Sequence, residues 1–236
     1  MDGDWTDHVT EDPRGSRHHR RDPRDLGQDL QDRQRRGRTR YDTFAETGSF
    51  DETFEQWGYV GPQTAAAIML NYVPTDGRVL DAACGSGLTG VALARLGYAV
   101  VEGIDISARL LEIAETTGAY RRLRRVDMQS LPLPFDDDSF DAVSFIGALT
   151  YFETADILRE LSRVVRSGGH VVFSQRDDLM RERDCGAQLR ALEDSGVWHR
   201  VYGTEPMPYL PRHPEYGTDI EAQYFVRSCP TGRCPR

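Results

Sequence analysis

From residue 78 onward, short apolar runs alternate with amphipathic segments along the chain. Runs of four to eight apolar residues bounded by Gly, Asp or Pro predict strands, and apolar positions spaced three and four residues apart predict helices. The expected strands are 78–82, 100–104, one ending near Val126, 140–145, 170–174, 197–202 and 221–226, and the expected helices are 88–96, 108–116, 154–165 and 187–195. This alternation predicts an α/β fold, a Rossmann-like, seven-stranded, mostly parallel sheet with helices on both faces.

Glycine and proline mark the expected connections. Ser167-Gly168-Gly169 predicts a turn that leads into the strand 170–174, and the stretch from Pro206 to Pro214 predicts a loop. Gly61–Pro62 predicts a break between two N-terminal helices, the second of which covers 63–72 and ends before Pro74.

The N-terminal third has a different pattern. Residues 1–40 are rich in Arg, Asp, Gln, Pro and His and predict a disordered tail. Residues 41–75 predict helices with an aromatic face, which either packs into the core or forms a lid over a ligand site. We therefore expect four parts: a tail over 1–40, lid helices over 41–75, a catalytic core over 76–228, and a C-terminal tail over 229–236.

Composition narrows the class of protein. Apolar residues make up 39% of the chain and charged residues 28%, which is typical of a globular protein with a polar tail. No apolar run reaches the ~18 residues that a membrane-spanning helix needs, and the charged N-terminus does not resemble a secretory signal. We expect a cytoplasmic protein with no membrane partner.

The charge distribution argues against nucleic acid as a partner. All 29 basic residues are arginine, so chemistry through a lysine Schiff base is excluded. Residues 41–236 carry 19 arginines against 29 acidic residues, a net charge of −10. A folded part with this negative charge repels the phosphate backbone of nucleic acids. We therefore expect a small-molecule substrate rather than a nucleic acid.

The four cysteines do not form a disulfide pattern. Cys84 lies in a glycine-rich motif, and Cys229 and Cys234 have no histidine nearby that would complete a zinc site. We expect unpaired thiols and no metal.

The strongest chemical signal is Val79-Leu80-Asp81-Ala82-Ala83-Cys84-Gly85-Ser86-Gly87. A buried strand ends in an aspartate, and a glycine-rich turn opens directly into a helix. Glycine at 85 and 87 lets the backbone approach a ligand closely. With Gly90, the motif also satisfies G-x-G-x-x-G, so a dinucleotide-binding fold is an alternative.

Two acids at the ends of the next strands bear on that alternative. Asp105 follows the second strand, and its carboxylate can accept hydrogen bonds from both hydroxyls of a ribose, which nicotinamide cofactors and S-adenosylmethionine share. Asp127 follows the third strand, where a carboxylate can accept from an adenine amino group while Met128 packs on the ring.

Taken together, the motifs VLDAACGSG, GIDIS, VDM, LPFDDDSFDAV and RSGGHVV resemble the class I S-adenosylmethionine-dependent methyltransferases, in the order and spacing of that superfamily over residues 76–176. The chain is similar to the ubiquinone/menaquinone-biosynthesis-like (type 11) branch and, more narrowly, to the Williams–Beuren-region methyltransferase-like proteins. The narrower resemblance rests on matches around Tyr41, Phe50, Tyr59 and Pro62 and on residues 145–149. It departs from that group at Val60, where an arginine is usual.

The resemblance implies S-adenosylmethionine as the cofactor and a role for each matching position. The implied site consists of Asp81, Ala83, Gly85 and Gly87 around the methionine part, Asp105 and Ile106 at the ribose, Asp127 and Met128 at the adenine, Gly147 and Leu149 near the methyl group, and Tyr59 and Tyr41 closing the site. For Ile106, Met128 and Leu149, ordinary packing is an equal alternative.

The acceptor side is less marked. Ligands bind outside the carboxyl ends of the strands in open α/β sheets, so His170 and His199, which begin strands, are expected at the opposite end. Candidates on the correct rim are Tyr151 and Glu153 after the fourth strand, and residues 175–177 after the fifth. Our hypothesis is that Tyr151 or Glu153 contacts the acceptor, together with Tyr41.

Three functions are compatible with these residues. The leading one is methyl transfer to a small molecule by direct in-line displacement, with the acceptor atom undetermined. A domain that binds the cofactor without methylating is the second, because no residue is marked as an obligatory base. An NAD-dependent oxidoreductase is the third, although nothing after the two acids resembles a hydride-transfer site.

Overall fold

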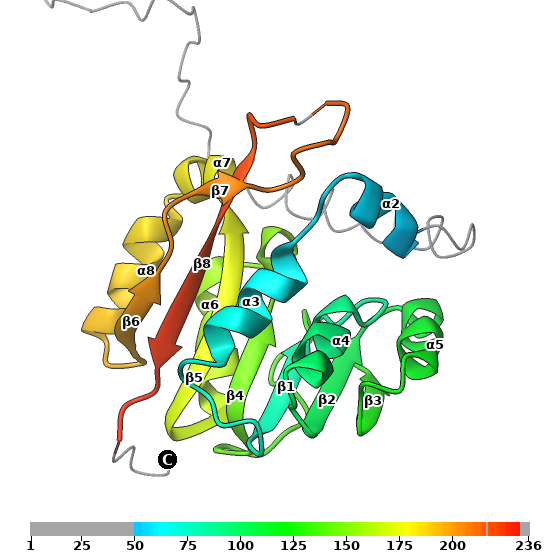
Figure 1. The fold of residues 1–236 in the computed structure, drawn as a ribbon. Helices are drawn as coiled ribbons and strands as arrows, with labels where there is room; N and C mark the ends of the chain where they lie inside the picture. Colours follow the sequence, from blue (N-terminus) through cyan, green and yellow to red (C-terminus); the bar gives the residue numbers. More distant parts are fainter. Residues whose placement is uncertain (1–49, 216, 232–236) are drawn as a thin grey trace, which may run out of the picture.

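The computed structural model describes residues 50–215 and 217–231, and within them a central sheet runs in the order β3-β2-β1-β4-β5-β8-β6, with β7 pairing with β8. The predicted α/β fold is confirmed, and Figure 1 shows the sheet with helices on both faces. The strands are β1 (Arg78–Ala82), β2 (Val100–Asp105), β3 (Arg122–Arg125), β4 (Phe140–Phe145), β5 (Val165–Arg176), β6 (His199–Gly203), β7 (Met207–Pro208) and β8 (Glu221–Ser228).

Five neighbouring strands, from β3 to β5, run parallel to one another. β8 is antiparallel to β5, β6 and β7. The path through the sheet has the seven expected strands. β7 is an additional two-residue strand within the stretch from Pro206 to Pro214, which was predicted to be a loop. Parallel strands place their carboxyl ends at one edge, which is the upper edge of the sheet in Figure 1.

The helices form two layers that bury different apolar clusters. In Figure 1, α3, α4 and α5 cover the near face, whereas α6 and α8 cover the far face. A short 3-10 helix, Leu149–Tyr151, follows β4. The α-helices are α2 (Phe50–Gln56), α3 (Gly61–Met69), α4 (Leu88–Arg95), α5 (Ala108–Thr116), α6 (Thr154–Val164), α7 (Asp177–Glu182) and α8 (Cys185–Asp194).

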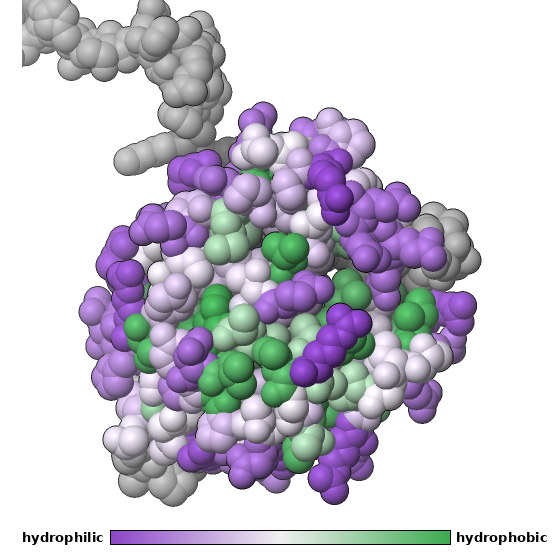
Figure 2. All heavy atoms as spheres, in the orientation of Figure 1, coloured by the Kyte–Doolittle hydropathy of each residue, from purple (hydrophilic) through white to green (hydrophobic). Residues whose placement is uncertain are grey.

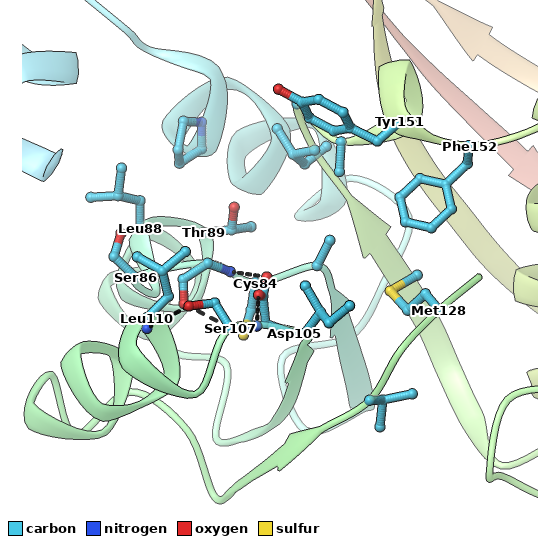
Figure 3. A pocket seen from close by; sticks show the side chains of 18 of the residues that line it. Cys84, Ser86, Leu88, Thr89, Asp105, Ser107, Leu110, Met128, Tyr151 and Phe152 are labelled. Atoms are coloured by element: carbon cyan, nitrogen blue, oxygen red, sulfur yellow. Dashed lines mark hydrogen bonds between the residues drawn. The ribbon is translucent and has the colours of Figure 1, made fainter. Parts of the chain in front are cut away.

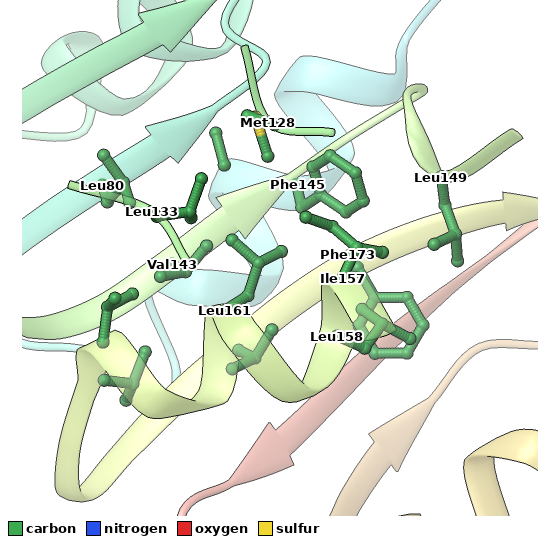
Figure 4. Close-up of a cluster of buried hydrophobic side chains, with 14 of the residues drawn as sticks. Leu80, Met128, Leu133, Val143, Phe145, Leu149, Ile157, Leu158, Leu161 and Phe173 are labelled. Carbon is green, nitrogen blue, oxygen red and sulfur yellow. The ribbon is translucent and has the colours of Figure 1, made fainter. Parts of the chain in front are cut away.

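α6 shows why its sequence forms an amphipathic helix. Its apolar positions recur every three to four residues, so Ile157, Leu158 and Leu161 share one face and are at most 2% exposed. Figure 4 shows this face packed against the side chains of Val143 and Phe173 from the sheet. Truncating one such leucine to alanine removes about 2–5 kcal/mol of stability, so this layer holds the sheet firmly in place.

Two predicted connections differ from the structure. Gly61 and Pro62, expected to break the chain, form the first turn of α3, where a missing proline N–H costs no helical hydrogen bond. The expected turn at residues 167–169 lies inside one long strand, β5. An irregularity in the β4–β5 register absorbs it, because Phe140 pairs with Val165 whereas Ala142 pairs with His170.

Figure 2 shows the near face with polar and charged side chains around its margin and apolar side chains grouped nearer its centre. Val60 and Leu70 are about half exposed, at 49% and 48%. Among the residues that the structure describes, no helix combines the length and the apolar character needed to cross a bilayer.

Candidate functional site

A cavity of about 450 Å³ opens at the carboxyl ends of the parallel strands. Its walls come from the segments that follow β1, β2, β3 and β4, closed by residues of α2, of the α2–α3 connection and of the β7–β8 connection. A concave site at this edge is where open α/β sheets bind ligands. The lining includes the predicted site residues Tyr59, Ala83, Gly85, Asp105, Ile106, Asp127, Met128, Gly147 and Tyr151.

The turn between β1 and α4 presents main chain to this cavity. Ala83, Gly85 and Gly87 have positive φ values of 55°, 55° and 99°, a conformation that glycine adopts without strain and alanine does not. A Cβ atom at Gly85 would meet no atom within 4 Å. The open space beside that backbone is the room that a closely approaching ligand needs.

Asp105 ends β2 directly beside this turn. One of its carboxylate oxygens accepts a hydrogen bond from the Gly85 N–H at 2.9 Å, and the other accepts from the Ser107 N–H at 2.8 Å. A carboxylate oxygen can accept more than one hydrogen bond, which is the chemistry that binding of a ribose diol requires. In Figure 3, Asp105 and Ser107 lie on one side of the cavity, opposite Met128 and Phe152.

Asp127 and Met128 follow β3 on the same rim. Asp127 is exposed and accepts a hydrogen bond from the Gln129 N–H at 3.0 Å. Met128 is only 4% exposed and belongs to the main apolar cluster while also lining the cavity. For Met128, packing and ligand contact are therefore compatible roles.

Asp81 lies beneath the turn and outside the cavity lining. It is 1% exposed and accepts a hydrogen bond from the Tyr120 hydroxyl at 2.7 Å. Burial raises the pKa of Asp81 to about 7, the nearby charge of Asp105 also raises it, and the Tyr120 hydrogen bond lowers it. Asp81 thus lies behind the cavity wall, linked through the Tyr120 hydroxyl to the Gly90 N–H in the first turn of α4.

The segment before α3 and the β7–β8 connection meet above the cavity. The Arg212 guanidinium donates to the Glu55 carbonyl oxygen at 2.8 Å, and its backbone N–H donates to the Trp57 carbonyl oxygen at 3.0 Å. Tyr59 and Tyr209 both line the cavity, with ring centroids 5.5 Å apart. We call the contacts of Arg212, Tyr209 and His213 with residues 54–59 the clasp.

The clasp brings Tyr59 close to the turn after β4. A Cβ atom at Gly147 would lie 2.9 Å from the Tyr59 hydroxyl oxygen, and Gly147 has a positive φ of 72°. Burial is the main cause that raises the pKa of Tyr59 above its usual value. The Ser86 hydroxyl donates to the Asp51 carboxylate, which links α2 to the glycine-rich turn.

Several predicted residues lie away from the cavity. Glu153 is exposed and precedes α6, and Leu149 is 1% exposed in the core. Gly87 is not part of the cavity lining, and a Cβ atom there would lie 3.0 Å from Tyr120 and 3.2 Å from Ala114. The described histidines, and residues 175–177, are also absent from its walls. Tyr41, the lid residue expected at the acceptor, falls outside the described residues, as does Cys234.

Two contributors were not predicted from the sequence. Tyr120 contacts Gly90 and Asp81, 30 and 39 residues away, and the only local hint is a glycine, Gly90, inside a helix. Ile146 lines the cavity but looks like an ordinary core position, whereas Phe54, which also lines it, belongs to the aromatic face that the sequence offered as core or lid. Of the cysteines that the structure describes, those at 84, 185 and 229 are buried, and Cys84 and Cys185 are free thiols as expected.

Comparison with known proteins places this geometry in a family. Residues 80–173 match the family model described as a methyltransferase domain. Methyltransferase-like protein 27 of Homo sapiens is 31% identical over 165 residues, which cover 67% of this chain and 66% of that protein. A demethylmenaquinone methyltransferase of Bacillus licheniformis is 34% identical over 109 residues, covering 44% of this chain and 47% of that protein.

A solved structure, an S-adenosylmethionine-dependent methyltransferase from Methanosarcina mazei, has the same fold. Its TM-score is 0.55 at 22% identity, and the match covers 70% of this chain and 97% of that chain. The chain spans between about half and two thirds of the two curated relatives named above. The family match, the relatives and the fold agree with the resemblance seen in the motifs and decide against the nicotinamide-dependent alternative: this chain belongs to the class I S-adenosylmethionine-dependent methyltransferases.

Proposed function

We propose that this chain transfers a methyl group from S-adenosylmethionine to a small-molecule acceptor. The observation that carries the proposal is the cavity wall itself. The open backbone at Gly85 lies beside the Asp105 carboxylate, and the exposed carboxylate of Asp127 follows on the same rim. Such a wall offers acceptors for a ribose diol and an adenine amino group, together with room for the methionine chain.

In this proposal each part of the cofactor has its own contacts. Asp105 and Ile106 hold the ribose, Asp127 and Met128 hold the adenine, and the backbone at 83–85 holds the methionine part. Asp81 and Gly87 keep that backbone in place from behind. Gly147 lies nearest to the methyl group, and Leu149 supports the turn that carries it.

The acceptor would bind on the aromatic side of the cavity. The aromatic lining residues there are Phe54, Tyr59, Tyr151, Phe152 and Tyr209. The charged lining residues, at 105, 109, 125 and 127, lie instead at or just after the carboxyl ends of β2 and β3. This separation favours an uncharged acceptor with an apolar or aromatic body. One relative acts, by its name, on demethylmenaquinone, an acceptor of that kind.

Methyl transfer from a sulfonium does not require a side chain to activate the donor. S-adenosylmethionine would supply a methyl group that is already activated as a sulfonium. The acceptor atom would bond to that methyl carbon in line as the carbon–sulfur bond breaks, and S-adenosylhomocysteine would leave as the neutral thioether. The chain contributes orientation of the two reactants and exclusion of water. We propose Tyr151 as a contact of the acceptor, and Tyr41 and Glu153 as further candidates for the same rim.

Transfer of a labelled methyl group tests the proposal. Purified protein with methyl-labelled S-adenosylmethionine should label uncharged acceptors with an apolar or aromatic body in preference to anionic ones. Tyr151→Phe should raise KM for the acceptor, whereas Tyr202→Phe, a partly exposed tyrosine on β6, should behave as wild type. Cofactor binding without label transfer to any acceptor would instead support a binding domain that does not methylate.

A further inference from the structure

The ring of Tyr120 occupies a socket behind the glycine-rich turn that three glycines leave open. A Cβ atom at Gly90 would lie 2.2 Å from the ring, one at Gly103 would lie 2.9 Å from it, and one at Gly87 would lie 3.0 Å from it. These separations are below ordinary carbon–carbon contact. The Tyr120 ring therefore stands against a side chain at all three positions, together with Leu123 and Cys84 at Gly103 and with Ala114 at Gly87. The ring lies between α4 and β2.

The hydroxyl of Tyr120 completes the first turn of α4. A helix leaves its first N–H groups without partners, and a side chain at the N-cap position normally accepts from one of them. Here the N-cap residue is Gly87, which has no side chain to do so. The Gly90 N–H instead donates to the Tyr120 hydroxyl oxygen at 3.1 Å, and that hydroxyl donates to Asp81 at 2.7 Å.

This chain of hydrogen bonds connects a negative charge to the positive end of the helix dipole. The protonation of Asp81 depends on several neighbouring groups that can themselves titrate. The titratable groups that interact with it are Tyr120, the carboxylate of Asp105, the thiol of Cys84 and the hydroxyl of Tyr59. Of these, the Tyr120 hydroxyl favours the charged form of Asp81, because it donates to the carboxylate.

We propose that Tyr120 is a positioning residue for the cofactor, which caps α4 from a distance and holds Asp81 in its ionised form beneath the turn that binds the methionine part. The proposal rests on the proposed function in naming the ligand, but the Tyr120–Asp81 coupling also acts in the unliganded protein. The ionised carboxylate attracts the ammonium group at the methionine end of the ligand and orders the backbone at 83–87.

Tyr120→Phe is the test, because phenylalanine still fills the socket and lacks only the hydroxyl. Tyr98→Phe is the matched control, since Tyr98 is 3% exposed and its hydroxyl donates to the Val73 carbonyl oxygen. The dissociation constant for S-adenosylhomocysteine is measured from about pH 6 to pH 9. In wild type, binding should weaken as the pH falls through about 7, the pKa of Asp81.

Without the hydroxyl, the pKa of Asp81 rises further, so the weakening should begin at a higher pH in Tyr120→Phe. If the pKa of Asp81 is displaced upward by one unit, binding by this variant should be about ten-fold weaker than that of wild type near pH 6 and about three-fold weaker near pH 7.5, and the gap should narrow further toward pH 9. Tyr98→Phe should follow the wild-type curve. Curves for Tyr120→Phe that parallel or superimpose on the wild-type curve overturn the proposal.

A second readout separates this proposal from the proposed function. The unfolding free energy of the unliganded proteins, followed in urea, should show a cost of Tyr120→Phe that grows as the pH rises from about 5 to 9, because the lost hydrogen bond is stronger to a carboxylate than to a neutral carboxyl. If wild type binds no S-adenosylhomocysteine, the proposed function fails, and the urea series alone then tests the coupling between Tyr120 and Asp81. A loss of unfolding free energy in Tyr120→Phe that does not vary with pH overturns this coupling.

Discussion

Replacing Asp81 by asparagine should make the unliganded protein more stable at alkaline pH while weakening its hold on the cofactor. Asp81 is 1% exposed, and its pKa is raised from 3.8 to about 7, chiefly by burial. A carboxyl whose pKa is raised on folding binds its proton more tightly in the folded state. Stability is therefore fully present below about pH 4 and is lost as the pH rises through about 7.

The size of this effect follows from the shift. About three pKa units at 1.36 kcal/mol each give a penalty of about 4 kcal/mol above pH 8. Asparagine carries no such penalty and its carbonyl oxygen can still accept from the Tyr120 hydroxyl. Its buried NH₂ group needs a partner of its own, and an unsatisfied donor costs about 1–3 kcal/mol. The net gain above pH 8 should be about 1–3 kcal/mol.

Urea unfolding of wild type and Asp81→Asn between about pH 4 and pH 9 measures the difference directly. The difference in unfolding free energy should move in favour of the variant as the pH rises from 4 to 8. Asp76→Asn, which changes an exposed aspartate, is the control and should stay within ~0.5 kcal/mol of wild type. A difference that does not vary with pH, or that moves in favour of wild type, would refute the reasoning.

Three further substitutions test the neighbouring contacts. Gly147→Ala places a Cβ atom 2.9 Å from the Tyr59 hydroxyl oxygen at a positive φ. Steady-state kinetics should therefore show kcat/KM lower by at least ~10-fold, which is ~1.4 kcal/mol, and unchanged kinetics would count against a close approach of Tyr59 to the turn after β4. Gly90→Ala should lower the free energy of unfolding in urea by about 1–3 kcal/mol because the new methyl group clashes with Tyr120. Helix propensity alone predicts an increase of ~1 kcal/mol, and an observed increase would show that the Tyr120 ring does not pack tightly against Gly90. Arg212→Gln removes a guanidinium contact of the clasp, so S-adenosylhomocysteine should dissociate faster in stopped-flow, and an unchanged rate would exclude the clasp from closing the site.

Local patterns predicted the architecture well because they are set by neighbours in the chain. The bounds of β1, α5 and β4 agree with the expected segments residue for residue, since each is a short apolar or amphipathic run that ends at a turn. Asp105 and Asp127 could be placed on one rim for a related reason. Parallel strands end at a common edge, so strand-end residues far apart in sequence meet there.

Contacts between segments far apart in the sequence could not be predicted from the sequence patterns. The clasp joins Arg212 to Glu55, 157 residues apart, and Tyr120 reaches Asp81 across 39 residues. No periodicity encodes such pairs, because each depends on how whole elements pack. The misplaced break at Gly61 has the opposite origin, since proline stops a helix in its interior and favours one in its first turn.

The central claim is that the cavity beside Asp105 holds S-adenosylmethionine. Calorimetric titration with S-adenosylhomocysteine tests it, using wild type, Asp105→Asn and, as a control, Glu115→Gln on the exposed face of α5. The account predicts one site per chain, weakened about 10- to 100-fold by Asp105→Asn through lost hydrogen bonds to a charged acceptor and unchanged by Glu115→Gln. No binding heat from wild type, or equal affinity in all three proteins, would contradict it.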